Sequence, residues 1–172
     1  MEDAYKHYFD SLTEAEKSWK SADHFVYVIL PAVKDNKIIL RAFENIYSSV
    51  VLIISNVLKI EYVHKRVNLT KDPKRNLEIF FTKCGNRYGL SEQDIEIIKE
   101  ILFLGRKHKE SGLEFSKSGK VIIVDDNLKT NELSLEKVKV FLKAEKKLLD
   151  NANRNFEDFF RKVFKAELRC NL

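Results

Sequence analysis

A histidine lies among three cations at residues 106 to 109. Arg106, Lys107 and Lys109 surround His108. The imidazole charge changes near neutral pH, and neighbouring cations bind phosphate while favouring the neutral, basic form of the ring. His108, with Arg106 or His64 completing the site, is therefore the candidate set for acid–base chemistry on a bound phosphate. The alternative is structural, because the helix dipole favours basic residues in a last helical turn.

A second basic stretch lies around residues 62 to 75. Its cations and Tyr62, as a stacking surface, predict a phosphate-binding corner. A solvated turn that complements a helix dipole is again the structural alternative. Taken together, the two stretches give the candidate nucleic-acid-binding residues: Lys65, Arg66, Lys71, Lys74, Arg75, Arg106, Lys107 and Lys109.

The other groups with ligand chemistry form no known pattern. Asp125, Asp126 and Asn127 offer oxygen ligands, but their spacing does not match a calcium loop. Cys84 and Cys170 are far apart, without the Cys-x-x-Cys spacing of a zinc site. The sequence has neither a glycine-rich phosphate loop nor a nucleophile elbow. We therefore expect no metal and no cofactor.

An aromatic stripe runs along the last helical segment, among basic residues. Exposed aromatic patches usually mark interfaces, so the stripe predicts self-association as a homodimer. The alternative is packing within the chain against the first helix. The candidate interface residues are Phe156, Phe159, Phe160, Val163 and Phe164.

Composition limits the fold that must position these groups. The chain has 172 residues, 44% of them hydrophobic, which is enough for one domain with a core. Five Gly and two Pro leave little turn chemistry for an all-β fold. The 31 basic and 26 acidic residues give a formal net charge of +5, which permits nucleic acid or an acidic membrane surface as a partner.

Apolar residues recur at alternating steps of three and four at both ends of the chain. This spacing predicts a mainly α single domain, a bundle of about five helices with long first and last helices. In the last seam, Glu145 holds one of the periodic positions. A switch to short β patterning predicts one hairpin near residues 113–124. The expected helices span residues 3–30, ending at Pro31, then 37–67, 73–84, 92–108 and 135–170, the last with a kink or break possible at the Asn-rich residues 151–155.

This order of elements resembles the HEPN superfamily of all-helical domains. The segments from Ser21 to Pro31 and from Arg106 to Ser111 also look like small archaeal proteins. The resemblance implies a homodimer and, for many members, a metal-independent ribonuclease with an Arg four to six residues before a His. No such Arg precedes any His here, so the resemblance favours the non-catalytic members that bind RNA or a partner.

We therefore expect a cytoplasmic helical binding module, homodimeric, that contacts RNA or another nucleic acid through basic helix ends. The N-terminus lacks a basic region followed by an apolar run, and the apolar stretch at residues 46–60 is too short to span a membrane. Two alternatives stay open. One is a HEPN-like ribonuclease with a non-standard site at His108, Arg106 or His64, and the other is an adaptor for a protein partner.

Overall fold

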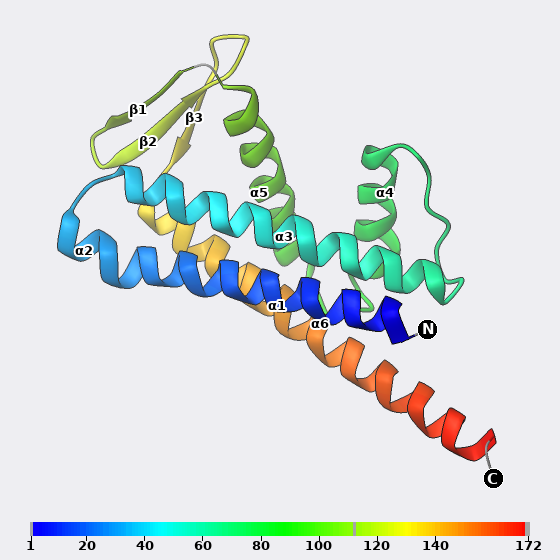
Figure 1. Ribbon diagram of the computed structural model, residues 1–172. Helices are drawn as coiled ribbons and strands as arrows, with labels where there is room; N and C mark the ends of the chain where they lie inside the picture. The colour runs from blue at the N-terminus through cyan, green and yellow to red at the C-terminus, as the bar shows by residue number, and fades with distance from the viewer. Residues whose placement is uncertain (1, 112, 171–172) are drawn as a thin grey trace.

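Three long helices form the body of the protein in the computed structural model (Figure 1). The structure describes residues 2–111 and 113–170, with side chains for residues 6–111 and 113–161. The first and last helices contact each other, and both contact α3. In chain order the elements are α1 (Glu2–His24), η1 (Phe25–Ile29), α2 (Leu30–Val33), α3 (Lys37–Val63), α4 (Pro73–Ile79), η2 (Phe80–Cys84), α5 (Glu92–Glu110), β1 (Leu113–Lys117), β2 (Lys120–Val124), β3 (Thr130–Leu133) and α6 (Leu135–Cys170).

Pro31 does not end the first helical segment, contrary to the sequence prediction. The chain widens into the π-helical turn η1, where the Leu30 amide donates to the Phe25 carbonyl. Pro31 then occupies the first turn of α2, where its missing N–H is tolerated. Lys34, in the left-handed conformation with φ 56°, terminates the helix.

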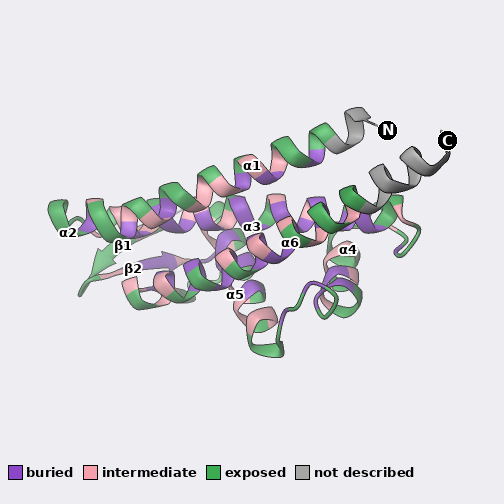
Figure 2. Ribbon diagram, turned by 90° about the horizontal axis from the view of Figure 1, so that it is seen from below, coloured by how far each residue is buried: buried purple, intermediate pink, exposed green. Residues whose placement is uncertain are grey.

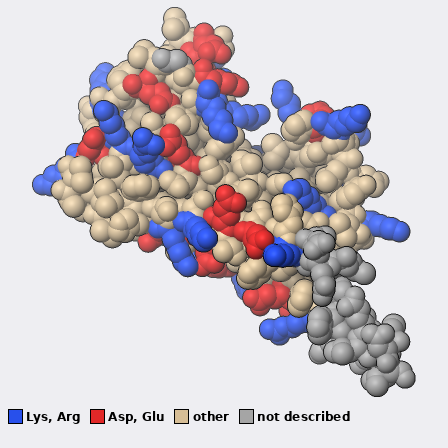
Figure 3. Space-filling view, in the orientation of Figure 1, with Lys and Arg blue, Asp and Glu red and all other residues tan. Residues whose placement is uncertain are grey.

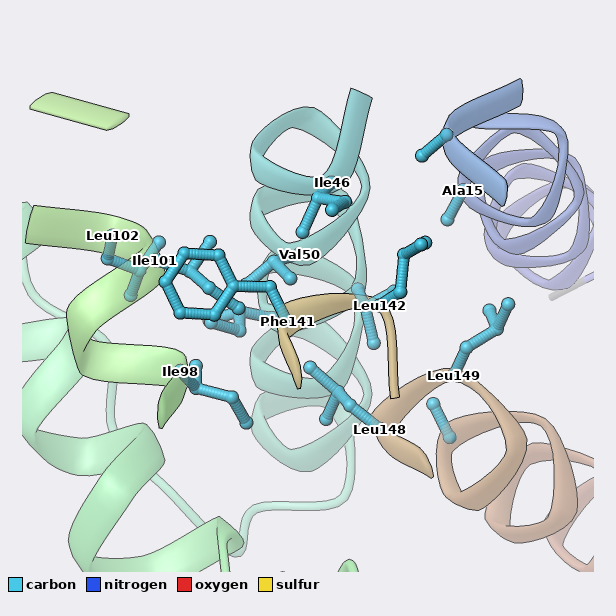
Figure 4. Packing of buried hydrophobic residues seen from close by; sticks show 14 of the residues in the cluster. Ala15, Ile46, Val50, Ile98, Ile101, Leu102, Phe141, Leu142, Leu148 and Leu149 are labelled. Atoms are coloured by element: carbon cyan, nitrogen blue, oxygen red, sulfur yellow. The ribbon is translucent and has the colours of Figure 1, made fainter. Parts of the chain in front are cut away.

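Helix α3 lies at the centre of the fold, as its nearly all-round apolar sequence predicts. It contacts α1, α5, α6 and β2. By length and composition it could also cross a membrane, but 44% of its most apolar window is buried inside this bundle. Figure 2 shows buried residues facing inward along the long helices. Figure 4 shows core side chains from four helices meeting: Ala15, Ile46, Val50, Ile98, Ile101, Leu102, Phe141, Leu142, Leu148 and Leu149.

The β insertion is a three-stranded antiparallel sheet rather than the expected hairpin. The β1–β2 hairpin is present, with Ser118 and Gly119 at φ 51° and 77° in a tight turn. The missed strand is β3, which pairs with β2 so that Leu133 lies opposite Val121. Only Leu133 of β3 is buried, so its sequence lacks the apolar alternation that marks a strand.

The last helix runs unbroken through its Asn-rich middle. Asn151 donates from Nδ2 to the Tyr88 carbonyl at 2.7 Å, and Asn155 donates to the Asn151 carbonyl at 2.8 Å. These bonds satisfy amides that otherwise disfavour a helix interior. At 1.5 Å per residue the 36-residue helix is about 54 Å long, and Figure 1 shows its end extending past α1.

Candidate binding groove

An apolar groove of about 320 Å³ lies over α3, between α4 and α5. Figure 3 shows the hollow between these two helices, with Lys and Arg side chains on both sides. One face of α3 forms the floor, because its lining positions recur at helical spacing. The α3 residues of the floor are Tyr47, Val51, Ile54, Ser55 and Leu58. The walls are Pro73, Asn76 and Leu77 of α4 and Leu102 and Arg106 of α5.

Gly105 determines how closely α5 approaches the floor at one end of the groove. A Cβ atom at this position would lie 1.9 Å from Cδ2 of Tyr47, far inside contact distance. The Tyr47 ring therefore packs directly on the α5 backbone. Lys109 covers the ring, with Nζ 4.8 Å from its centroid, a cation–π contact. The ring is thus fixed at one end of the floor and is not a free stacking surface.

Predicted basic residues lie on both flanks of this groove. Arg106 lines it from α5, and Lys74 and Arg75 lie on α4 beside the lining residue Pro73. All three side chains are exposed. Within residues 6–161, where side chains are described, no ion pair involves any of them. The flanks therefore carry positive charge that is available to a ligand.

Asp72 defines the end of α4 that carries these cations. Its side chain accepts a hydrogen bond from the Lys74 amide at 2.9 Å, and Pro73 follows at the first helical position. This is the helix start that the sequence predicts. Lys71, immediately before the cap, is exposed.

His108 is held between two carboxylates. Its Nδ1 lies 2.5 Å from Oε1 of Glu114 in β1, and its Nε2 lies 3.1 Å from Oε1 of Glu44 in α3. The ring therefore links the end of α5 to α3 and to the sheet, with both nitrogens occupied. The neighbouring Lys107 pairs with Asp125 at 3.6 Å and with Glu110 at 3.7 Å.

His64 lies at the other end of α3 and does not approach His108. His108 contacts Glu44, and His64 caps the same helix twenty residues later, so the backbone positions of Glu44 and His64 are about 30 Å apart along α3. The His64 ring packs on Phe159, with centroids 3.9 Å apart. Burial, and next the Arg66 charge, lower the pKa of His64. The structure thus brings the predicted catalytic residues to separate places.

Asp125 stabilises the turn between β2 and β3. Its Oδ1 accepts hydrogen bonds from the Asn127 and Lys129 amides, each at 3.0 Å. The bond from the Lys129 amide is the largest cause of its lowered pKa. Its other carboxylate oxygen faces Lys107. These contacts explain the acidic turn as a structural element.

The aromatic stripe of α6 divides between core and surface. Phe156 is buried and packs edge-on against Tyr8 of α1, with centroids 6.5 Å apart. Phe159 packs on His64, and Phe160 is 45% exposed. The side chains of Val163 and Phe164 lie outside the described residues. The predicted packing against the first helix is therefore found for Phe156, whereas Phe159 packs at the end of α3.

Two glutamates are buried at positions for which the sequence predicted no buried charge. Glu61, near the end of α3, pairs with Arg66 and Arg87. Glu145, in the seam of α6, is fully buried. A carboxylate at a periodic position of a helix seam is the sequence signal for both, since such positions face the core.

Comparisons with known protein families, curated proteins and solved structures gave no match to this chain. The resemblance to HEPN domains therefore stays a prediction.

Proposed function

We propose that this chain is a helical binding module whose binding face is the groove between α4 and α5. This proposal is carried by an apolar floor that is open to solvent and has exposed cations on both flanks, none of them in an ion pair with another described side chain. Val51 in the middle of that floor is 41% exposed. A contiguous apolar surface edged by charge is typical of an interaction site.

The occupant that fits best is an amphipathic helix of a protein partner with acidic residues beside its apolar stripe. The floor from Tyr47 to Leu58 covers about 16 Å at 1.5 Å per residue, which is three helical turns. Its lining is mostly aliphatic, which suits apolar side chains spaced at three and four residues. Arg106, Lys74 and Arg75 would then face the acidic edges of that helix.

Single-stranded RNA is the second candidate, because the same unpaired cations suit phosphates. The aliphatic floor suits single-stranded RNA less well than it suits an amphipathic helix. Nucleobase binding without sequence preference relies on aromatic stacking platforms, and the groove's one aromatic ring, Tyr47, is covered by Lys109. A ribonuclease at His108, Arg106 or His64 is disfavoured by the separation of the two histidines and by the carboxylates on His108.

Replacing Val51 by Lys is expected to weaken binding of a helical probe at least about tenfold, because a charge then lies on the apolar floor. The probe is a designed amphipathic peptide with Leu at positions i, i+3 and i+7 and Glu on both edges. Binding is measured by amide chemical shifts of the labelled protein. The affected signals should fall on residues 47–58, on α4 and on residues 102–109.

Val140→Lys is the matched control, since Val140 is 46% exposed on α6, away from the groove. It should bind the probe as the parent does. An equal loss of peptide binding in Val51→Lys and Val140→Lys would contradict a groove site. Amide chemical-shift changes spread over the whole surface would contradict it too. If single-stranded RNA binds the groove and the peptide does not, the RNA candidate replaces the helix.

Homodimer formation through the aromatic stripe of α6 remains part of this proposal. Phe160 is the exposed residue of that stripe whose side chain the structure describes. Phe160→Glu is expected to reduce the sedimentation coefficient to that of a monomer, because an interface core does not tolerate an unpaired charge. An unchanged mixture of species in the parent and the variant would contradict dimerisation through this face.

A further inference from the structure

Two arginines converge on one buried carboxylate at the end of α3. Glu61 has a side chain only 1% exposed, and each of its oxygens meets a different guanidinium. Oε1 lies 3.0 Å from Nη1 of Arg66, and Oε2 contacts Nη1 of Arg87. The Tyr88 hydroxyl also donates to Oε1, at 3.4 Å. Glu61 therefore fixes the position of both arginines from beneath.

The backbone is shaped to place Arg66 over Glu61. Lys65 adopts the left-handed conformation with φ 57°, and the Arg66 amide then donates to the Glu61 carbonyl at 2.9 Å. This is the bond of a Schellman motif, which brings the second residue past the helix end against its last turn. A hydrophobic contact usually accompanies that motif. Here the contact is the ion pair of Arg66 with Glu61.

Arg87 reaches the same carboxylate from the loop between η2 and α5. The loop is anchored, because Tyr88 is buried and its carbonyl accepts a hydrogen bond from Asn151 at 2.7 Å. Burial raises the pKa of Tyr88 to about 12, so its hydroxyl keeps its proton and remains a donor to Glu61. The two arginines come from different parts of the chain but are both held in place.

The cluster carries one more positive charge than the burial of Glu61 requires. One arginine is enough to neutralise one carboxylate, and the second leaves a net charge of +1. The arginine side chains are 47% and 43% exposed, so both remain partly accessible from solvent. Each guanidinium has five N–H donors, and Glu61 contacts only one nitrogen of each. Donors and charge are thus available to an oxyanion.

We propose that Arg66 and Arg87 form a binding site for a phosphate monoester, with Glu61 as a positioning residue. Planar guanidinium groups bind phosphate oxygens in pairs, which a single lysine cannot reproduce. None of these residues lines the groove, and the proposal does not rest on the function proposed there. Burial, and next the Arg66 charge, lower the pKa of the His64 ring, so the ring favours its neutral form and leaves the positive charge of the site to the two arginines.

The test is a titration of the full-length labelled protein with inorganic phosphate at pH 7.5 and constant ionic strength. The side-chain Nε–H signals of Arg66 and Arg87 are expected to shift. Arg87→Lys and Arg66→Lys should each raise the dissociation constant at least about fivefold, because lysine keeps the charge but loses the planar fork. A lysine also leaves Glu61 with a cationic partner, so the fold is retained.

Arg41→Lys is the matched control, an arginine of α3 that pairs with Glu44 at 3.7 Å. It should bind phosphate as the parent does, and so should Val51→Lys. Absence of phosphate binding, or unchanged affinity in Arg87→Lys, would overturn the site. A further pair of probes separates the sources of the phosphate. An RNA oligonucleotide that binds more tightly with a 5′-phosphate than with a 5′-hydroxyl identifies a strand end. If inorganic phosphate binds but the 5′-phosphate adds nothing to the binding of RNA, the source is a small phosphorylated molecule.

Discussion

The free energy of unfolding of Glu145→Gln, relative to that of the parent, is expected to rise by about 4 kcal/mol between pH 5 and pH 8. Glu145 is fully buried, and neither carboxyl oxygen has a hydrogen-bond partner among the described residues. Ser49 lies nearby, but its hydroxyl donates to the Ala15 carbonyl at 3.1 Å. Burial therefore raises the pKa of Glu145 to about 9 and outweighs the lowering by Ser49.

The direction of the pH effect follows from proton binding. The unfolded chain releases the Glu145 proton near pH 4.5, whereas the native protein keeps it up to about pH 9. Across this interval the native state binds more protons, so the free energy of unfolding falls as pH rises. The loss is about 1.4 kcal/mol per pH unit, and it stops above pH 9, where both states are ionised. Glutamine has no proton to release and removes this slope.

The measurement is urea unfolding of the parent and the variant at pH 5, 6, 7 and 8. Glu157→Gln is the control, because Glu157 is exposed on the same helix. Its free energy of unfolding should follow the parent's pH dependence. If Glu145→Gln keeps that dependence too, the carboxyl is not a buried neutral group.

Helices were predictable where one local signal determined them. The helix expected from residue 92 begins there, because Ser91 and Asp94 form a capping box in which Ser91 N donates to Asp94 Oδ2 at 2.8 Å. The all-round apolar pattern correctly placed α3 in the centre. Strand β3 and the continuation past Pro31 were missed because they depend on a partner strand and on a π turn, which no local pattern specifies.

Site geometry was less predictable, because it arises from contacts between distant residues. The basic residues of α4 and α5 were identified, but the aliphatic floor that lies between them belongs to the helix expected to be buried all round. Arg66 was grouped with its neighbours in sequence, whereas the structure pairs it with Glu61 and brings in Arg87, 26 residues from Glu61. Sequence spacing gave the charge of each stretch but not its partner.

Gly105→Ala is expected to destabilise the protein by about 2 kcal/mol, although alanine is the better helix former by about 1 kcal/mol. The added Cβ would lie 1.9 Å from Cδ2 and 2.6 Å from Cγ of Tyr47, so the whole ring must leave its place. That movement also breaks the contact of Lys109 with the ring. The steric cost therefore exceeds the gain in helix propensity.

Gly105→Ala should raise, rather than lower, the free energy of unfolding once the Tyr47 ring is removed. In a Tyr47→Ala background, the three atoms nearest to the added Cβ are absent, and Gly105→Ala is expected to stabilise the protein by about 1 kcal/mol. Urea unfolding of the two single variants and the double variant measures both steps. Stabilisation of similar size in both backgrounds would mean that Tyr47 does not pack on α5. If Tyr47 does pack there, Gly105→Ala should also weaken binding of the amphipathic peptide, because the displaced ring no longer forms the end of the groove.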